Sequence, residues 1–585
     1  MKRIINLILI TLLIGSLYSC KEDFLSNQPA GKTAGDVMKT PEGVEGLLIG
    51  TYDKLSGDGN WNASSMLDWV WGSMSSDDAY KGESGSSPLS LSNIERYSPI
   101  ASDRNYSHRW RVCYDGVNRA NTTLEFLQET QEGDNPISDD RAMEIEAEAK
   151  FLRAYYHFKA TILWEKIPYI KTEEEMGMKP EEVPNDSEGW DEIEADLQFA
   201  IDNLDDTPPK GDVGRVDKWA AKAFKARVHM MQNELSEARP LLDDIINGPF
   251  ELADHYYDNY NSAKENNSES IFEIQASKTE FGGPLQANHL GPMGPVWPYG
   301  GPAPTGWGFF QPSKDLFKAY QTVEGLPVLD KEDREELATD MGISNSEEFH
   351  PTDHPLDPRV DWTIMRRGID YMGWGIHTGS DWIRSPSTGG PMMTKKYTLL
   401  KENEEHLFGG GFASAQNWQV FRLSHILLWR AEIHVENNEF DEARHLVNQI
   451  RQRAQNTDPV MGRVTTYVFR APPSDENIDW DQPAANYDIE LYPEGADAFS
   501  TKEKARKAVR LEQRLEFATE GLRFFDLRRW GIADEVLNDF IEDDVTYRNF
   551  MQDAHFDAEV NDYWPLPEGQ LDIQEGVLEQ DPAFR

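Results

Sequence analysis

An internal repeat constrains the fold of this chain more than any other feature of its sequence. Residues 224–246 align without gaps onto residues 429–451, 205 positions later, and nine of the 23 aligned positions are identical. Each copy has one helical apolar pattern, then an asparagine (Asn233 or Asn438), then a second helical pattern. Alanine is shared at positions where two helices must approach closely. Each copy is therefore predicted to be a helical hairpin with a tight turn at its asparagine.

Hairpins of this kind are typical of tetratricopeptide repeats, whose units stack to build a continuous core. Here they are scattered along the chain instead of following one another directly. Residues 141–164 add a helix with apolar rows on two faces, as expected for a helix packed between neighbours. The sequence predicts an all-α fold. Its scaffold of tetratricopeptide-like hairpins lies mainly in 141–250 and 419–530, within a single domain over residues 31–585.

Three stretches rich in glycine, proline and aromatic residues interrupt this scaffold, at 57–110, 281–312 and 361–418. The second contains eight glycines and seven prolines in 32 residues, which excludes a continuous helix. We expect these stretches to form a large irregular, loop-rich half of the domain that faces a ligand.

The N-terminus predicts export and lipid anchoring. Lys2 and Arg3 precede an apolar run that ends shortly before Cys20, as in a lipoprotein signal peptide over residues 1–19. Cys20 is the predicted lipidation site, acylated as the first mature residue, and residues 20–30 are the predicted flexible linker. More than one acyl chain is needed for stable anchoring.

Charge and missing motifs exclude several classes of function. The chain has 57 Lys and Arg against 103 Asp and Glu, a formal net charge of −46, so a nucleic-acid partner is excluded. Zinc-protease, serine-hydrolase and phosphate-loop motifs and paired cysteines are all missing. We therefore predict no catalytic residue, no cofactor and no metal. An all-helical glycoside hydrolase or polysaccharide lyase stays open as the alternative, because two suitably spaced carboxylates suffice for glycoside hydrolysis.

Four segments resemble the SusD/RagB family of outer-membrane nutrient-binding lipoproteins. They are residues 147–170, 420–436, 511–531 and 561–585, and the third, LEQRLEFATEGLRFFDLRRWG, is the most specific. Residues 308–325 are similar to the family's mid-chain helix that begins after Pro-Ser. The resemblance spans nearly the whole mature chain in the expected order.

The resemblance implies a non-enzymatic protein at the outer face of the outer membrane. It would bind a glycan or oligosaccharide and deliver it to a TonB-dependent β-barrel transporter of the SusC type. A binder of another nutrient, such as a peptide, is a further alternative. The arginines of segment 511–531 are expected to bridge helices and not to touch ligand.

The predicted ligand site combines aromatic rings with polar groups. Sugar rings stack on aromatic side chains, and their hydroxyl groups require polar partners. In the family's starch-binding member the sugar site draws on regions that correspond roughly to residues 68–110 and 290–310. From these regions we predict eight ligand-binding residues: Trp71, Asp77, Asp78, Arg96, Tyr97, Trp297, Tyr299 and Trp307.

Overall fold

The computed structural model describes residues 35–57, 67–86, 88–276, 296–304, 306–408, 413–469 and 473–585. Cys20, the predicted signal peptide and the predicted linker lie outside these ranges. The longer helices are α3 (Pro41–Asp53), α5 (Arg104–Gln131), α6 (Asp139–Trp164), α8 (Trp190–Asn203), α9 (Lys218–Met231), α10 (Leu235–Ile246), α16 (Leu423–Glu436), α17 (Phe440–Asn456), α18 (Lys502–Phe517) and α20 (Ala533–Asp544). The shorter helices are α2 (Gly35–Met38), α4 (Leu89–Glu95), α7 (Glu173–Met176), α13 (Lys314–Ala319), α14 (Val360–Thr363), α15 (Pro386–Gly389), α19 (Arg523–Arg529), α21 (Ala558–Asn561) and α22 (Glu568–Ile573).

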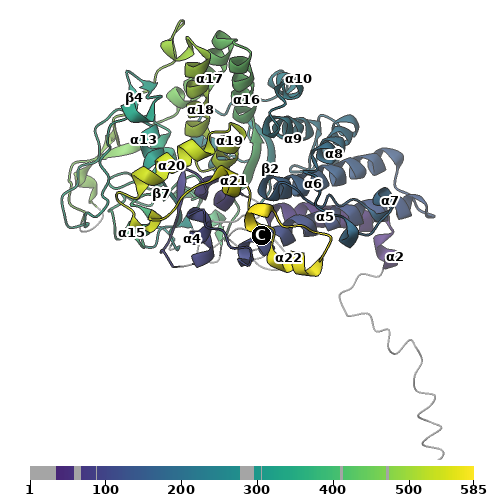
Figure 1. The fold of residues 1–585 in the computed structure, drawn as a ribbon. Coiled ribbons are helices and arrows are strands. Elements are labelled where there is room, and N and C mark those ends of the chain that lie inside the picture. The colour runs from purple at the N-terminus through teal and green to yellow at the C-terminus, as the bar shows by residue number, and fades with distance from the viewer. Residues whose placement is uncertain are drawn as a thin grey trace, which may run out of the picture.

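The long helices pack as one row that largely follows the order of the chain (Figure 1). Helix α6 packs between α5 and α8, α8 packs against α9, and α10 packs against α16. Helix α6 is buried almost throughout from Ile145 to Trp164, because its apolar side chains face neighbours on two sides. The predicted all-α scaffold is confirmed.

The two copies of the repeat form the hairpins α9–α10 and α16–α17. Asn233 and Asn438 stand at the turns with φ of 60° and 61°, a left-handed conformation that asparagine tolerates better than most residues. The predicted hairpins and their turns are confirmed. The copies also touch, since Arg430 Nε of the second lies 2.5 Å from Asp243 Oδ1 of the first.

Among the described residues, the strands are short and pair only in twos, always antiparallel. The pairs are β1 (Ala79–Gly82) with β3 (Phe309–Pro312), β2 (Ser270–Ile274) with β10 (Trp418–Arg422), β4 (Thr322–Val323) with β5 (Leu326–Pro327), β6 (Ile364–Met365) with β7 (Met393–Thr394), β8 (Leu407–Phe408) with β9 (Ala413–Ser414), and β11 (Met461–Val464) with β12 (Ile478–Pro483). The β2–β10 pair joins the chain after the first repeat hairpin to the chain before the second.

A buried ion network holds the loop-rich half to the helices. Glu516 of α18 accepts ion pairs from three guanidinium groups, with Nη1 of Arg422 at 2.6 Å, Nη1 of Arg359 at 3.0 Å, and Arg453. Arg422 and Arg453 both also bind Glu269, at 2.9 Å. Burial alone would raise the pKa of Glu516, but the arginines outweigh it and hold the pKa below its ordinary value. The network therefore joins β10, α17 and α18 to residues 269 and 359.

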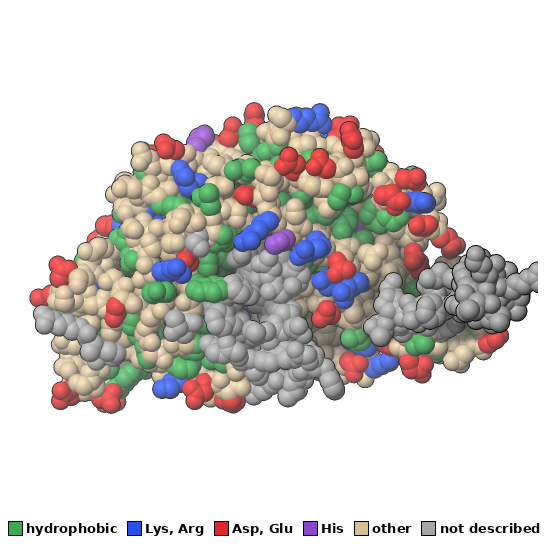
Figure 2. All heavy atoms as spheres, turned by 90° about the horizontal axis from the view of Figure 1, so that it is seen from below, with side chains coloured by type: hydrophobic (Ala, Val, Ile, Leu, Met, Phe, Trp, Pro, Cys, Tyr) green, Lys and Arg blue, Asp and Glu red, His purple; other side chains and the backbone are tan. Residues whose placement is uncertain are grey.

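The acidic side chains are dispersed over the surface and do not form one patch on the face shown in Figure 2. Figure 2 shows carboxylates around the edge of one face, interspersed with basic and hydrophobic side chains. Within the described ranges, no helix is both long and apolar enough to cross a bilayer.

Candidate functional site

The structure places Trp71 in the core and not on a ligand-binding surface. This residue lies in a π-helical segment, Trp69–Met74, and its side chain is fully buried. Its ring lies 5.7 Å from that of Tyr106 and 5.2 Å, edge to face, from that of Trp564. The predicted role of Trp71 in stacking on a ligand is wrong, because neighbouring rings cover it.

Asp77 and Asp78 are buried partners of the C-terminal arginines. Asp77 Oδ1 lies 2.8 Å from Arg523 Nε, and Asp78 Oδ1 lies 2.9 Å from Arg514 Nε. Burial would raise the pKa of Asp77, but Arg514 and Arg523 hold it below its ordinary value. Both aspartates are at most 2% exposed, although Asp77 lines a cavity of about 450 Å³ together with Trp530. These two predictions are also wrong, because the arginines already occupy the carboxylates.

Arg96 and Tyr97 lie at the edge of the core. Arg96 donates from Nη2 to the carbonyl of Gln552 at 2.6 Å, and Tyr97 donates from its hydroxyl to the carbonyl of Ser75 at 3.3 Å. The ring of Tyr97 stands edge to face with that of Phe556, at 5.1 Å between centroids. Both side chains are half-buried and bound within the protein, so the structure gives them a packing role.

The second predicted region separates into buried and exposed rings. Trp297 is fully buried and stands edge to face with Tyr371 and Trp374, at 6.2 Å and 5.9 Å. The prediction for Trp297 is wrong, because neighbouring aromatic rings of the main hydrophobic core cover it. Trp307 is half-buried against the main core, whereas Tyr299 is 49% exposed. Of the eight predicted residues, Tyr299 offers the most accessible ring.

Close backbone packing fixes the position of Tyr299. Its N–H donates to the carbonyl of Trp382 at 3.0 Å, and the N–H of Gly300 donates to the same oxygen at 3.3 Å. A Cβ atom at Gly300 would lie 2.5 Å from the carbonyl oxygen of Asp381, and Gly301 has φ of +98° over the Trp382 indole. Only glycines allow residues 299–301 to lie so closely across residues 381–382.

Charged groups from two other segments adjoin the Tyr299 ring. The guanidinium of Arg384 lies 5.3 Å from the ring centroid, within range of a cation–π interaction. Arg384 Nη1 lies 2.6 Å from Oε1 of Glu83, and the N–H of Glu83 donates to the carbonyl of Gly308 at 2.8 Å. We call Tyr299, Arg384 and Glu83 the tyrosine surface.

The tyrosine surface has the chemistry of a sugar contact. An exposed phenol ring offers an apolar face for C–H groups, and the adjoining guanidinium of Arg384 can donate to hydroxyls. Glu83 is buried, and its carboxylate holds Arg384 in place. Tyr299 is predicted from the sequence, whereas Arg384 and Glu83 are not. They stand 85 residues after and 216 residues before Tyr299 in the chain, and no local pattern marks either one.

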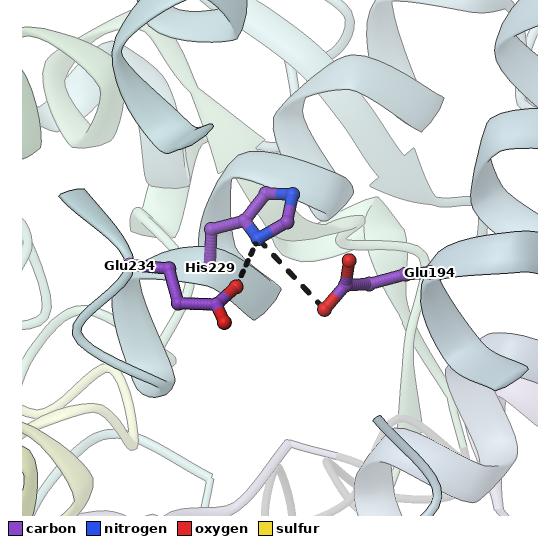
Figure 3. Close-up of side chains that lie close together, drawn as sticks. All are labelled: Glu194, His229 and Glu234. Atoms are coloured by element: carbon purple, nitrogen blue, oxygen red, sulfur yellow. Dashed lines mark hydrogen bonds and ion pairs between the residues drawn. The ribbon is translucent and has the colours of Figure 1, made fainter. Parts of the chain in front are cut away.

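His229 lies between two glutamates, in a group whose ligand atoms are close enough together to hold a metal ion. Glu194 and Glu234 both point toward Nδ1 of His229, at 3.8 Å and 2.8 Å (Figure 3). The second repeat hairpin reproduces the shorter bond, with Nδ1 of His434 2.6 Å from Oε2 of Glu439. Because both hairpins share this bond at identical positions of the repeat, we interpret it as a closure of the hairpin turn and not as a metal centre.

Row-packed helical hairpins with a loop-rich half define a helical-repeat scaffold, and the candidate site lies on its irregular segments. A sequence profile described as the SusD family matches residues 268–584, and one described as starch-binding associating with outer membrane matches residues 23–230. The chain belongs to the SusD family.

Alignments with similar proteins cover almost the entire chain. SusD-like protein P25 of Formosa agariphila is 25% identical over 600 residues, which cover 99% of this chain and 98% of that protein. The surface glycan-binding protein A of Bacteroides thetaiotaomicron, solved in complex with laminarihexaose, has a TM-score of 0.65 at 20% identity, with 92% and 99% of the two chains covered. A laminarin-binding SusD-like protein has a TM-score of 0.62 at 21% identity, with 93% and 99% covered. These structures share the fold of this chain.

Proposed function

We propose that the chain binds a glycan or oligosaccharide, without cleaving it, through a site that includes the tyrosine surface. The observation that supports this most is the exposed ring of Tyr299, held by glycine-mediated packing beside Arg384 and Glu83. Membership of the SusD family supports the same proposal, since similar structures include proteins named for binding glycans and laminarin. Trp307, half-buried on the same loop, is a candidate for a second contact.

Replacing Tyr299 with alanine should weaken glycan binding roughly tenfold or more while leaving the melting temperature nearly unchanged. A stacked ring at the centre of a binding site contributes about 1–3 kcal/mol. The ring is half exposed, so its removal leaves no large cavity. Isothermal titration with the oligosaccharide retained best by the wild type measures the change. Val323→Ala, a truncation at a 64% exposed position on the β4–β5 pair, is the matched control. Unchanged affinity in the Tyr299 variant would place the site elsewhere.

We further propose that Cys20 carries the lipid anchor, and that the protein faces the exterior of the outer membrane. The profile described as associating with outer membrane supports this location. A lipid-anchored chain cannot itself carry a glycan through the membrane, so the proposal includes a TonB-dependent SusC-like β-barrel transporter as its partner. The helical row would supply a rigid face for that partner.

Affinity purification from native membranes in mild detergent tests the partner. The complex should contain a large β-barrel protein in roughly equal amount. A chain of this size docked on a barrel would bury well over about 2,000 Å² of surface, so the complex should survive mild detergent. Mass spectrometry of the same sample should find an acylated N-terminal Cys20. Recovery of the chain alone would contradict the transporter partnership, and an unmodified N-terminus elsewhere would contradict the anchor.

A further inference from the structure

A second exposed aromatic ring stands on the β11–β12 hairpin, away from the residues of the tyrosine surface in the chain. Trp480 is 45% exposed, and it is the one tryptophan of the described ranges whose side chain is largely open to solvent. Tryptophan is usually well buried, since its indole is the largest apolar side chain. Exposure alone does not make a binding site, so the packing of the indole against the facing strand is the more important feature.

The hairpin backbone is shaped to support this indole. Gly462 lies on the facing strand with φ of +99°, and a Cβ atom there would stand 2.6 Å from a ring carbon of Trp480. The strand register is irregular at this point, between the pairs Met461–Pro483 and Arg463–Asp479. Such irregularities re-aim side chains. The indole therefore rests directly against backbone on one side, and the exposed part of the ring faces solvent.

Exposed polar residues are the neighbours of Trp480 in the chain. Along β12, Asp479, Asp481 and Gln482 are exposed beside Trp480. A ring flanked by carboxylates and an amide suits a ligand that has apolar C–H faces and hydroxyl donors. An anionic partner is disfavoured by the two aspartates.

From this arrangement we propose that Trp480 forms a second sugar-binding platform, which contacts a pyranose of a polysaccharide through its exposed ring. Asp479 and Asp481 would accept hydrogen bonds from sugar hydroxyls. The proposal rests on the proposed glycan-binding function but names a separate site.

The two platforms belong to segments joined by hydrogen bonds. The N–H of Phe469, shortly after β11, donates to the carbonyl of Asn345 at 3.0 Å. The side-chain oxygen of Asn345 accepts from Asp381 N–H at 3.2 Å, and Asp381 precedes the residue that anchors Tyr299. Two platforms on connected segments would strengthen the capture of a long chain more than that of a short one, because the second contact becomes intramolecular.

Fluorine NMR of the full chain, purified in detergent and labelled with 5-fluorotryptophan, tests the platform directly. Trp480→Phe assigns one resonance among the 17 tryptophans. The probes are the neutral laminarin, amylopectin and xylan, together with the anionic pectin and alginate, which the two aspartates should disfavour at Trp480. We expect the Trp480 resonance to shift with at least one of them, and to shift also in the Tyr299→Ala background, where the tyrosine surface is impaired.

Variant binding provides the second readout, by retention in gels that contain the same polysaccharides. Trp480→Ala should weaken retention by a long chain about tenfold but leave hexasaccharide binding at the tyrosine surface unchanged. Gly462→Ala keeps the indole but places a methyl group where the ring packs against the backbone, so it should also weaken retention. Val468→Ala, at a 40% exposed position near β11, should change nothing.

The outcomes separate this inference from the proposed function. If the wild type is retained but the Trp480 resonance does not move with any probe, the second platform is refuted and glycan binding at the tyrosine surface stands. A resonance that moves only when a partner protein is added would also refute it, and would make Trp480 a protein contact. If none of the five polysaccharides is retained and no resonance moves, both proposals fail.

Discussion

Replacing Glu516 with alanine is expected to cost at least about 3–5 kcal/mol of the free energy of unfolding, and to prevent accumulation of folded protein at 37 °C. The substitution leaves Arg359, Arg422 and Arg453 buried without their shared carboxylate. Removal of one member of a buried ion pair is strongly destabilising, because the remaining charge stays out of water. Arg422 still pairs with Glu269 and Glu520 in this variant, so the destabilisation comes from losing the carboxylate that links the three arginines.

Urea denaturation followed by tryptophan fluorescence measures this effect. Glu503→Ala is the matched control, since Glu503 lies on the same helix with its side chain 83% exposed and only a long 3.9 Å contact to Lys507. That variant should stay within about 0.5 kcal/mol of the wild type. Equal stability of the Glu516 and Glu503 variants would show that the network does not hold the two halves together.

Replacing Gly72 with alanine is the second substitution expected to have a large effect. A Cβ atom at this position would stand 1.8 Å from the carbonyl oxygen of Gly521, which is backbone and cannot move aside. Gly521 also donates its N–H to Ser73 Oγ at 2.9 Å, so the two segments are fixed together. We expect a loss of about 3 kcal/mol or more, because overpacking at a backbone contact displaces whole segments.

Gly46→Ala provides the opposite expectation for the same chemical change. Gly46 lies on the exposed face of α3, and a Cβ atom there would meet nothing within 4 Å, so alanine should stabilise the helix by about 0.5–1 kcal/mol. Thermal denaturation of both variants gives the comparison. If both glycine substitutions raise the stability of the protein, residues 72 and 521 do not approach each other as closely as described.

The scaffold could be predicted from the sequence because its determinants are local. The apolar rows of 141–164 and the asparagines at 233 and 438 each act within a few residues of their position. The arginines of segment 511–531 were also correctly interpreted as structural. Arg514 and Arg523 bind Asp77 and Asp78, and Arg529 binds Glu432.

The candidate site could be predicted only in part, for reasons that are not local. Asp77 and Arg523 are separated by 446 positions, and no sequence pattern predicts that they pair. Trp297 stands in a glycine-rich loop like Tyr299 two residues later, yet Tyr371 and Trp374 cover it. The exposure of Trp480 has no local indication either, since an aspartate on each side of a tryptophan is typical of a half-buried strand with its ring toward the core.

The most direct test of the central claim combines retention and product analysis in one measurement. The purified chain is run through native gels that contain each of the five polysaccharides, and the one that retains it best is then incubated with the protein at length. The account predicts retention by at least one polysaccharide, with no new reducing ends and no unsaturated products. Products that increase in proportion to added protein would make the chain a hydrolase or lyase, and passage through every gel without retention would contradict glycan binding itself.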